Sequence, residues 1–546
     1  MSQNNLLYLV LIILIISSCQ KDEIPPTSEV VSETDFSFVD SLHKPTVLGK
    51  KLENPYSVEN MNRAWKNLSK TNVVQQYSLD VEDEALILEP THRYIKFMPA
   101  SDDELAILES DSTLVLYDHP LDYEIEETGD YYRDPEIPED QPTYQYASVP
   151  IEQEITVPVA YEILEELFIP DEADEESQDD DEAFMRLPEV MTQNASLVDA
   201  LVDEALRITG NLEEDEQNDN KEETEFGLFS RRKKWRPAGR IQVWDDVLGK
   251  YIPMQGVKVR SRRWFTTHTG ITNSSGYYSC DGRYRGKARY IIKWKRHHFS
   301  IRWSWLSTAK YRGPRSKSDW NLNIRGGTQQ YYATIFRAAH HYYYENIKGL
   351  RRPPQNYSWH TQMKIRAFLE NGGDCGGSTT SIGCHSTGWR FFGLWSPIKI
   401  YAYELSSSQI YATTIHELAH ASHWDMDRSN FRGTNDKVKE SWARGVEWEL
   451  TRMKYPSSKY KGRERSTGNY TLVVADMIDN SSTDKTNFGY GFNNWEMQDN
   501  VSGYTIRQIE DALKHQKTWN GWRDNIRNRY ENNTEQHLNS LFSAYE

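Results

Sequence analysis

The sequence is poor in cysteine and has no apolar stretch long enough to cross a membrane. Only four of its 546 residues are cysteines, and the longest apolar run covers residues 6–16. A membrane-spanning helix needs about 20 apolar residues, so this run is too short to be one. An internal repeat is also lacking. The hydrophobic fraction of 38% and the aromatic fraction of 12% are sufficient for packed cores, which excludes full-length disorder.

Basic residues are scarce in the first part of the chain and acidic residues are scarce in the middle. Residues 1–230 contain 13 Lys and Arg against 54 Asp and Glu, residues 231–325 contain 24 against 4, and residues 326–546 contain 26 against 23. The net charges of -41, +20 and +3 add up to the total of -18. Such steps mark domain borders. The large acidic part argues against a nucleic-acid binder, because it would repel phosphate.

The N-terminus has the features of a targeting signal. Residues 6–16 have the length of a signal-peptide apolar region, although residues 1–5 lack Lys and Arg. The segment Ile16-Ser17-Ser18-Cys19 resembles a bacterial lipobox, and the Lys-Asp-Glu that follows resembles the surface-export signal of Bacteroidota lipoproteins. This resemblance implies that residues 1–18 are removed and that Cys19 is acylated. The expected location is the cell envelope, as a surface-exposed outer-membrane lipoprotein held by its lipid anchor; an ordinary secretory signal with a chance cysteine is the alternative.

Composition and patterning divide the remainder into a series of domains. We expect a small α/β N-terminal module with helices at residues 58–68, 101–108 and 161–167 and a strand at 94–97. Nine acids in residues 171–182 indicate a solvated linker, which includes a short helix at 196–208. The predicted borders are 19–55 for a tether, 56–170 for the acidic module, 171–235 for the linker, 236–310 for an all-β sandwich and 320–546 for a C-terminal α+β, mostly helical domain.

Residues 236–310 carry a pattern with a known counterpart. Pro253-x-x-Gly256-Val257-x-Val259, followed by Thr272-Asn273 and Gly276-Tyr277-Tyr278, resembles the carboxypeptidase regulatory-like (transthyretin-like) β-sandwich. The N-terminal module is similar to a module that precedes such sandwiches in Bacteroidota lipoproteins. The sandwich is rich in Arg, Lys and Trp, which leaves two interpretations open. Its surface binds a glycan, a lipid headgroup or an acidic partner, or it complements the acidic N-terminal part by intramolecular docking.

The candidate chemistry lies in one predicted helix, from about Gln409 to Trp424. It contains His416-Glu417-Leu418-Ala419-His420. Histidines at i and i+4 lie about 40° apart around the helix and about 6 Å apart along it, so both reach one Zn²⁺. Glu417, adjacent to the first ligand, is placed to take a proton from a zinc-activated water. His423 lies too far along the helix to join the same ion.

The third ligand decides the class of site. Glu440 opens a second helix in the sequence Glu440-Ser441-Trp442-Ala443, and this arrangement resembles gluzincin zinc metallopeptidases. The resemblance implies that His416, His420 and Glu440 bind zinc and that Glu417 acts as general base in the hydrolysis of peptide or protein substrates. Glu447 is the second choice for the carboxylate ligand. Asp436, in a segment that resembles the aspzincin pattern, is the third.

Several further assignments follow from the same resemblance or remain open. Residues 398–405 are expected to form the sheet edge that pairs with substrate, and Tyr490, Tyr504 or His515 to stabilise the oxyanion. The alternative function is a cell-surface protein that binds a glycan or a protein and has an inactive zincin-like domain. Cys375 and Cys384 flank a Gly/Ser-rich loop. They form a disulfide, remain free thiols or join His385 in a metal site, while Cys280 lies buried in a strand.

Overall fold

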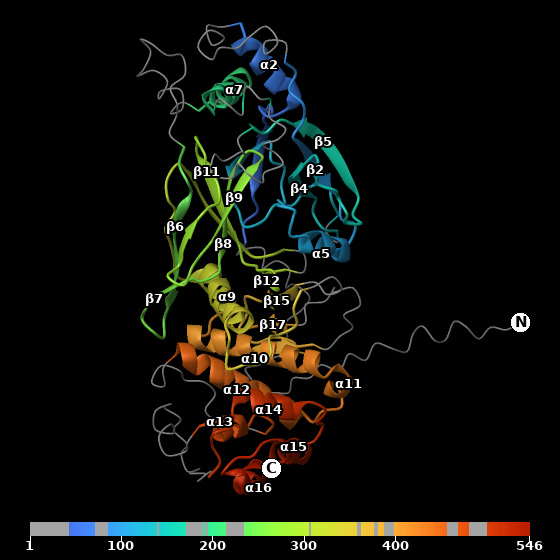
Figure 1. The fold of residues 1–546 in the computed structure, drawn as a ribbon, viewed down its shortest axis with the longest axis vertical. Coiled ribbons are helices and arrows are strands. Elements are labelled where there is room, and N and C mark those ends of the chain that lie inside the picture. Colours follow the sequence, from blue (N-terminus) through green and yellow to red (C-terminus); the bar gives the residue numbers. More distant parts are fainter. Residues whose placement is uncertain are drawn as a thin grey trace, which may run out of the picture.

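The chain forms a mixed α/β protein whose parts are stacked along one long axis (Figure 1). A computed structural model describes residues 43–70, 86–138, 141–170, 188, 191, 195–213, 234–304, 307–356, 362–375, 380–386, 398–455, 468–479 and 500–546. The predicted signal peptide 1–18, Cys19, the acidic run 171–182 and Tyr490 lie outside these residues. Among the described residues, no helix is long and apolar enough to cross a bilayer.

The N-terminal module is built around a three-stranded antiparallel sheet, β4-β2-β5. Its elements are β1 (Val47–Lys51), α2 (Val58–Leu68), β2 (His92–Phe97), α5 (Asp102–Ser110), β3 (Tyr123–Glu127), β4 (Gln145–Pro150) and β5 (Tyr161–Leu167). The two predicted helices α2 and α5 and the strand β2 are confirmed. Helix α5 begins after Ser101, whose side chain accepts a hydrogen bond from the backbone N–H of Glu104.

The helix predicted at residues 161–167 is wrong, because this segment is strand β5. It pairs along its length with β2, with Phe97 opposite Tyr161 and His92 opposite Leu167. Its sequence, YEILEEL, contains good helix formers. Pairing with a buried neighbouring strand outweighs that local preference, since strand formation depends on cross-strand contacts more than on intrinsic propensity.

Helix α7 (Ala195–Ile208) belongs to the module rather than to a linker. It packs on α2, and both helices share a core in which Leu197 and Leu201 join Met61 and Trp65. The helix was predicted correctly, but the assignment of all of residues 171–235 to a linker was wrong. The cause is the apolar face of α7, which is buried against α2 instead of facing solvent.

The β-sandwich consists of two facing sheets. One has the order β10-β6-β14 with β7 paired to β6, and the other has the order β13-β11-β8-β9. Ile241 and Val243 of one sheet and Val259 and Ile292 of the other lie in the core between them, and Cys280 is buried there as a free thiol. The strands are β6 (Ala238–Asp245), β7 (Lys250–Pro253), β8 (Lys258–Arg263), β9 (Thr266–Ile271), β10 (Tyr277–Ser279), β11 (Ala288–Lys293), β13 (Lys310–Ser316) and β14 (Leu322–Ile324).

A further sheet, with the order β12-β15-β17-β16, shows that the predicted border at residue 310 is wrong. Strand β12 (Phe299–Arg302) pairs in parallel with β15 (Met363–Ala367), although β13 and β14, which follow β12 in the chain, return to the sandwich. The chain therefore crosses between the two units more than once, and their apolar residues form one continuous core. The two remaining strands are β16 (Gly383–His385) and β17 (Ile398–Ile400).

Helices cover this sheet and form the C-terminal end of the molecule (Figure 1). Helix α9 packs against α10, and α10 packs in turn against α12. The predicted helical character of the C-terminal end is confirmed for the described residues. The helices are α9 (Gly327–Tyr344), α10 (Ser407–Met426), α11 (Arg428–Phe431), α12 (Asp436–Lys454), α13 (Val473–Ile478), α14 (Ile506–Leu513), α15 (Trp519–Arg529) and α16 (Leu538–Ala544).

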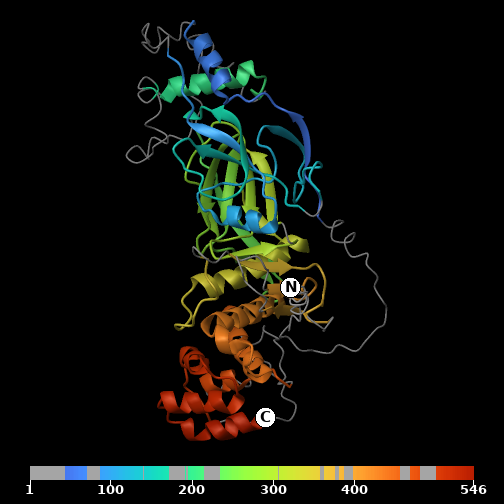
Figure 2. The same ribbon diagram turned by 90° about the vertical axis from the view of Figure 1, so that its right-hand side faces the viewer.

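The acidic module lies against the basic sandwich (Figure 2). Asp118 binds Lys310 at 2.6 Å and Arg312 at 3.3 Å. Phe265 of the sandwich extends into the module core, where its ring meets that of Tyr94 at 5.0 Å. Burial by itself would raise the pKa of Asp118, but the charges of Lys310 and Arg312 hold it well below the usual value. The carboxylate is therefore ionised and paired inside the interface.

Replacing Asp118 should destabilise the protein strongly. In Asp118→Asn two buried cations lose their counter-charge, so we expect the free energy of unfolding at pH 7 to fall by about 3–5 kcal/mol. Because the folded pKa is depressed, this contribution exists above the unfolded pKa of about 3.9 and disappears as the pH falls through the folded value. Urea unfolding at pH 7 and at low pH measures both effects. Glu124→Gln, at an exposed position of β3, is the control, and equal midpoints for the two variants would contradict the expectation.

Candidate metal centre

Helix α10 brings His416 and His420 to one place. It begins at a capping box, in which Ser406 and Gln409 exchange hydrogen bonds between side chain and backbone. Ile415, Leu418 and Ala419 are fully buried around the histidines. The helix is therefore fixed on several sides, and the four-residue spacing aims both imidazoles at the same point.

Helix α12 supplies the carboxylate. The Asn435 side chain accepts a hydrogen bond from the backbone N–H of Lys437 and so starts the helix. Trp442, Ala443 and Val446 are fully buried on α12, which packs along α10. This packing carries Glu440 from the next helix to the two histidines.

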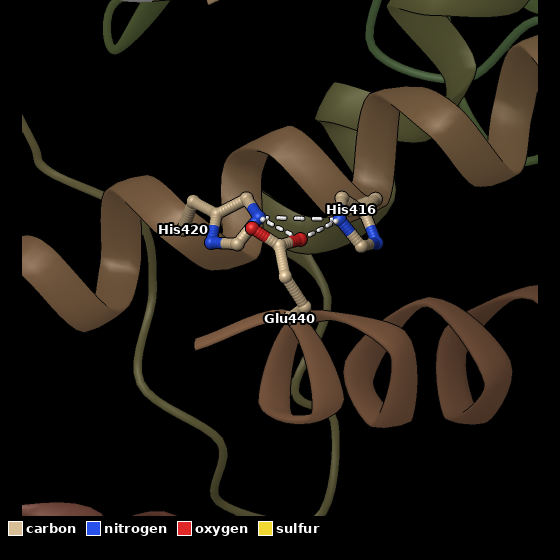
Figure 3. Close-up of side chains that lie close together, drawn as sticks. All are labelled: His416, His420 and Glu440. Atoms are coloured by element: carbon tan, nitrogen blue, oxygen red, sulfur yellow. Dashed lines mark hydrogen bonds and ion pairs between the residues drawn. The ribbon is translucent and has the colours of Figure 1, made fainter. Parts of the chain in front are cut away.

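The three predicted ligands meet, and their donor atoms form a small triangle (Figure 3). Glu440 Oε2 lies 3.2 Å from His416 Nε2 and 3.1 Å from His420 Nε2, and the two nitrogens are 3.1 Å apart. Ligands about 2.0–2.1 Å from a tetrahedral zinc ion lie about 3.3 Å from one another. The triangle is close to that size, and its chemistry, two imidazoles and a carboxylate, fits a divalent metal ion.

The three donor side chains are buried, so a charge on any one of them is costly unless an opposite charge or a hydrogen bond balances it. The exposed fractions of His416, His420 and Glu440 are 7%, 1% and 2%. Although burial opposes a charge on His416, hydrogen bonds to Glu440 and Glu447 raise its pKa. Burial would raise the pKa of Glu440, but the charge of His420 and the hydrogen bonds from both histidines lower it below its usual range. The carboxylate is thus held ionised, ready to bind a cation.

Glu447, the second choice for the carboxylate ligand, has a different position. Its Oε2 lies 3.0 Å from Nδ1 of His416, on the side of the ring opposite to the triangle. Arg444 in turn donates to Glu447 at 3.4 Å. A carboxylate on the outer nitrogen fixes the ring and its tautomer and makes the inner nitrogen a better ligand. Glu447 is therefore a positioning residue for His416.

Glu417 points toward the sheet instead of joining the triangle of ligands. It is 3% exposed. A Cβ atom on Gly383 of β16 would lie only 2.8 Å from Glu417 Oε1. Only glycine lets β16 pass this close, so the backbone of β16 lies directly beside the candidate base.

The expected edge strand at residues 398–405 is wrong in two respects. Strand β17 covers only Ile398–Ile400, and it lies between β15 and β16. Among the described residues, the strand at this edge of the sheet is β16, which runs antiparallel to β17. Sequence patterning missed β16 because it is only three residues long and follows a glycine-rich loop.

Cys375 and Cys384 form a disulfide, and its second cysteine lies in β16. Both sulfurs are buried beside Tyr401. This pairing removes the alternatives of two free thiols and of a metal site with His385. The bond ties the middle of β16 to the preceding loop, so it fixes the strand that contacts Glu417.

The other candidates lie away from the donor triangle. Asp436 forms an ion pair with Lys439 at 2.7 Å, and His423 packs on Phe431, where burial lowers its pKa to about 3. His515 pairs with Asp427 at the end of α10, and Tyr504 is buried next to α13. None of these four belongs to the metal-binding group found among the described residues.

Tyr470 is a residue near the site that sequence reasoning missed. The centre of its ring lies 5.8 Å from that of the His416 ring. The guanidinium carbon of Arg444 lies 5.4 Å from the centre of the same tyrosine ring. It comes from the segment before α13, thirty positions beyond Glu440, and no motif in the sequence marks it. Its ring is tilted by 31° against the imidazole of His416.

Comparison of the chain with protein-family models, with curated proteins and with solved structures finds no match. The interpretation of this site therefore depends on its own residues and geometry.

Metal binding provides a direct test of the ligand assignment. Glu440→Ala removes a ligand, so the purified variant should lose the bound metal. Glu447→Gln should retain it with an affinity about 10- to 100-fold lower, because only the support of His416 is weakened. Elemental analysis by mass spectrometry after dialysis against graded chelator measures both, with Glu404→Ala at an exposed position as control. Full metal content in Glu440→Ala would contradict the assignment.

Proposed function

We propose that this protein is a zinc-dependent metallopeptidase of the gluzincin type. The observation that supports this most strongly is the buried triangle of His416, His420 and Glu440 with Glu417 beside it. Two imidazoles and one carboxylate are a ligand set found in catalytic zinc sites, and three protein ligands leave a position open for water or substrate. Structural zinc sites are usually closed by four protein ligands.

The residues of the chain divide the work of hydrolysis. A zinc ion held by His416, His420 and Glu440 would supply a Lewis acid that polarises the peptide carbonyl and makes water more acidic. Glu417 takes a proton from the water whose oxygen attacks the carbonyl carbon. As the C–N bond breaks, Glu417 delivers that proton to the leaving nitrogen. Glu447 keeps His416 oriented throughout, and Tyr470 is a candidate donor to the developing oxyanion.

Strand β16 is the proposed docking edge for the substrate. An extended peptide that adds to a sheet edge gains main-chain hydrogen bonds and lies in register with the edge strand. Gly383 places β16 next to Glu417, and the His385 ring stacks on that of His420 at 6.4 Å. A peptide paired with β16 would therefore run past the metal ligands.

The location proposed for this activity is the bacterial cell surface. The lipobox ending at Cys19 and the export signal that follows it support an outer-membrane lipoprotein. Several acyl chains give stable anchoring, since each buried methylene contributes about 0.8 kcal/mol. A protein substrate outside the cell would be the target.

A second candidate function, binding of a glycan or protein, has one specific observation in its favour. The outer face of the first sandwich sheet carries Trp244 and Tyr251, whose rings meet at 5.2 Å, and an Arg325 guanidinium 4.3 Å from the Trp244 ring. Tyr277 on the same sheet is 52% exposed. Aromatic groups of this kind are typical of recognition surfaces. Binding of polysaccharide by zinc-loaded protein that cleaves no peptide would favour this function.

Glu417→Gln separates metal binding from catalysis. The amide preserves shape but cannot accept the proton, so kcat should fall about 10²- to 10⁴-fold while zinc remains bound. Cleavage of a peptide library, together with metal analysis, measures the two properties on one sample. The wild-type activity should disappear with chelator and return with zinc. Undiminished cleavage by Glu417→Gln with full zinc content would rule out this role of Glu417.

Loss of the disulfide should reduce activity without releasing the metal. In Cys375→Ser with Cys384→Ser, β16 is no longer tied to its loop, so we expect kcat/KM to fall at least several-fold because small misplacements at a site are costly. Cys280→Ser, which changes the buried free thiol, is the matched control. If the double variant kept wild-type kcat/KM, the edge strand would not depend on this bond.

A further inference from the structure

The second sandwich sheet presents a row of cations to the N-terminal module. Arg260 of β8 lies opposite Ile291 of β11, and Lys293 of β11 lies opposite Lys310 of β13. Because side chains alternate along a strand, every second residue from these positions lies on the same face. We call this set the cationic face. Its members are Lys258, Arg260, Arg262, Arg289, Lys293, Lys310 and Arg312.

The N-terminal module provides partners for one part of the cationic face, by ion pairs, a hydrogen bond and an aromatic ring. Asp118 pairs with Lys310 and Arg312. The Lys293 ammonium donates to the Leu116 carbonyl at 2.7 Å, and the Arg262 guanidinium lies 4.8 Å from the Tyr117 ring centre. These cations have defined partners in the loop that follows α5.

The other part of the cationic face contains Arg260 and Lys258, and both charges act on Lys295, which follows β11 in the chain. Arg260 is 7% exposed, and its Nη1 is buried without a hydrogen-bond partner. In the part of the chain that the structure describes, Lys258 and Lys295 are half-buried, and neither forms an ion pair. Two acids act on these groups. Glu109 acts on Arg260 and Lys295, but its carboxylate is bound to Arg302 at 2.5 Å. Asp281 acts on Lys258 and accepts a hydrogen bond from the backbone N–H of Thr269. Positive charge therefore exceeds negative charge in this corner of the interface.

Such an excess is costly to the free protein. A buried charge without a partner is strongly destabilising, and like charges raise each other's free energy. The electrostatics of Lys295 reflect this. Its burial, together with the charges of Arg260, Arg302 and Lys258, lowers its pKa to about 8, although Glu109 acts in the opposite direction. An anion placed among the three cations would remove the imbalance.

We propose that Arg260, Lys258 and Lys295 bind a small free oxyanion of the phosphate or sulfate type. A guanidinium presents a planar fork of donors that matches two oxygens of such an anion, and ammonium groups add point charges. Because Lys258 and Lys295 are only half-buried, an anion can reach them from solvent. Because Arg260 is buried, the site admits only a small ligand. The site lies in the sandwich, on β8 and beyond the end of β11, and is independent of the metal centre on α10 and α12.

The bound anion would hold the module on the sandwich. Glu109 and Leu116, which contact Arg302 and Lys293, come from the α5 segment that covers this corner. Neutralising the cations next to them favours the docked arrangement, so anion binding and docking should stabilise each other.

Titration of the full-length protein with inorganic phosphate tests the proposal. Thermal unfolding is measured at increasing phosphate and constant ionic strength, with chloride as the replacement ion. The wild-type Tm should rise and reach a plateau. In Arg260→Met the response should vanish or require at least about tenfold more phosphate. Arg240→Met is the matched control, because Arg240 lies on the other sheet over Tyr277, and it should respond like the wild type.

A second variant keeps the test informative if Arg260→Met folds poorly. Lys295→Gln retains the buried guanidinium and should bind phosphate several-fold more weakly by calorimetric titration. In the absence of phosphate, Arg260→Met should be at least as stable as the wild type, because an unpaired buried charge has been removed. The proposal is overturned if the wild type shows no saturable response, or if Arg260→Met responds to phosphate as the wild type does.

Discussion

The structure of the C-terminal end depends on holding one carboxylate and two imidazoles together out of water. Their donor atoms lie 3.1–3.2 Å apart, in a place where solvent cannot moderate their charges. Two helices with fully buried faces are needed to hold them, because a looser support would let the polar groups separate toward water. A divalent cation resolves the same constraint, since it satisfies all three donors at once. The position of Glu447 on the outer nitrogen of His416 is consistent with this arrangement.

The two edge strands of the sheet beside these helices, β12 and β16, have different neighbours. At the β12 edge, Arg302 binds Glu109 of the N-terminal module, so that side is occupied by the protein's own chain. At the other, β16 passes Glu417 at a glycine and is fixed by the disulfide of Cys384. An edge strand offers free backbone groups to a second chain. Among the described residues, the edge beside Glu417 is therefore the one at which the proposed pairing with a peptide would take place.

The uneven charge of the sequence has a structural counterpart in the interface between module and sandwich. Pairs such as Asp118 with Lys310 are local, short and buried, so they determine how the two units fit. The complementarity is incomplete at Arg260, whose Nη1 has no partner. The net charge of a segment cannot reveal such an unpaired group, because an excess of positive charge at one point and an excess of negative charge at another cancel in the sum.

The sequence by itself determined those features that depend on neighbours within one or two helical turns. The spacing of His416 and His420 and the place of Glu417 were predictable, because the helix period fixes which side chains share a face. Only the tertiary structure decided between Glu440 and Glu447, turned residues 161–167 into a strand, placed β17 inside its sheet and returned β13 and β14 to the sandwich after β12. Each of these depends on contacts between segments far apart in the chain, and local preferences are too weak to overrule them.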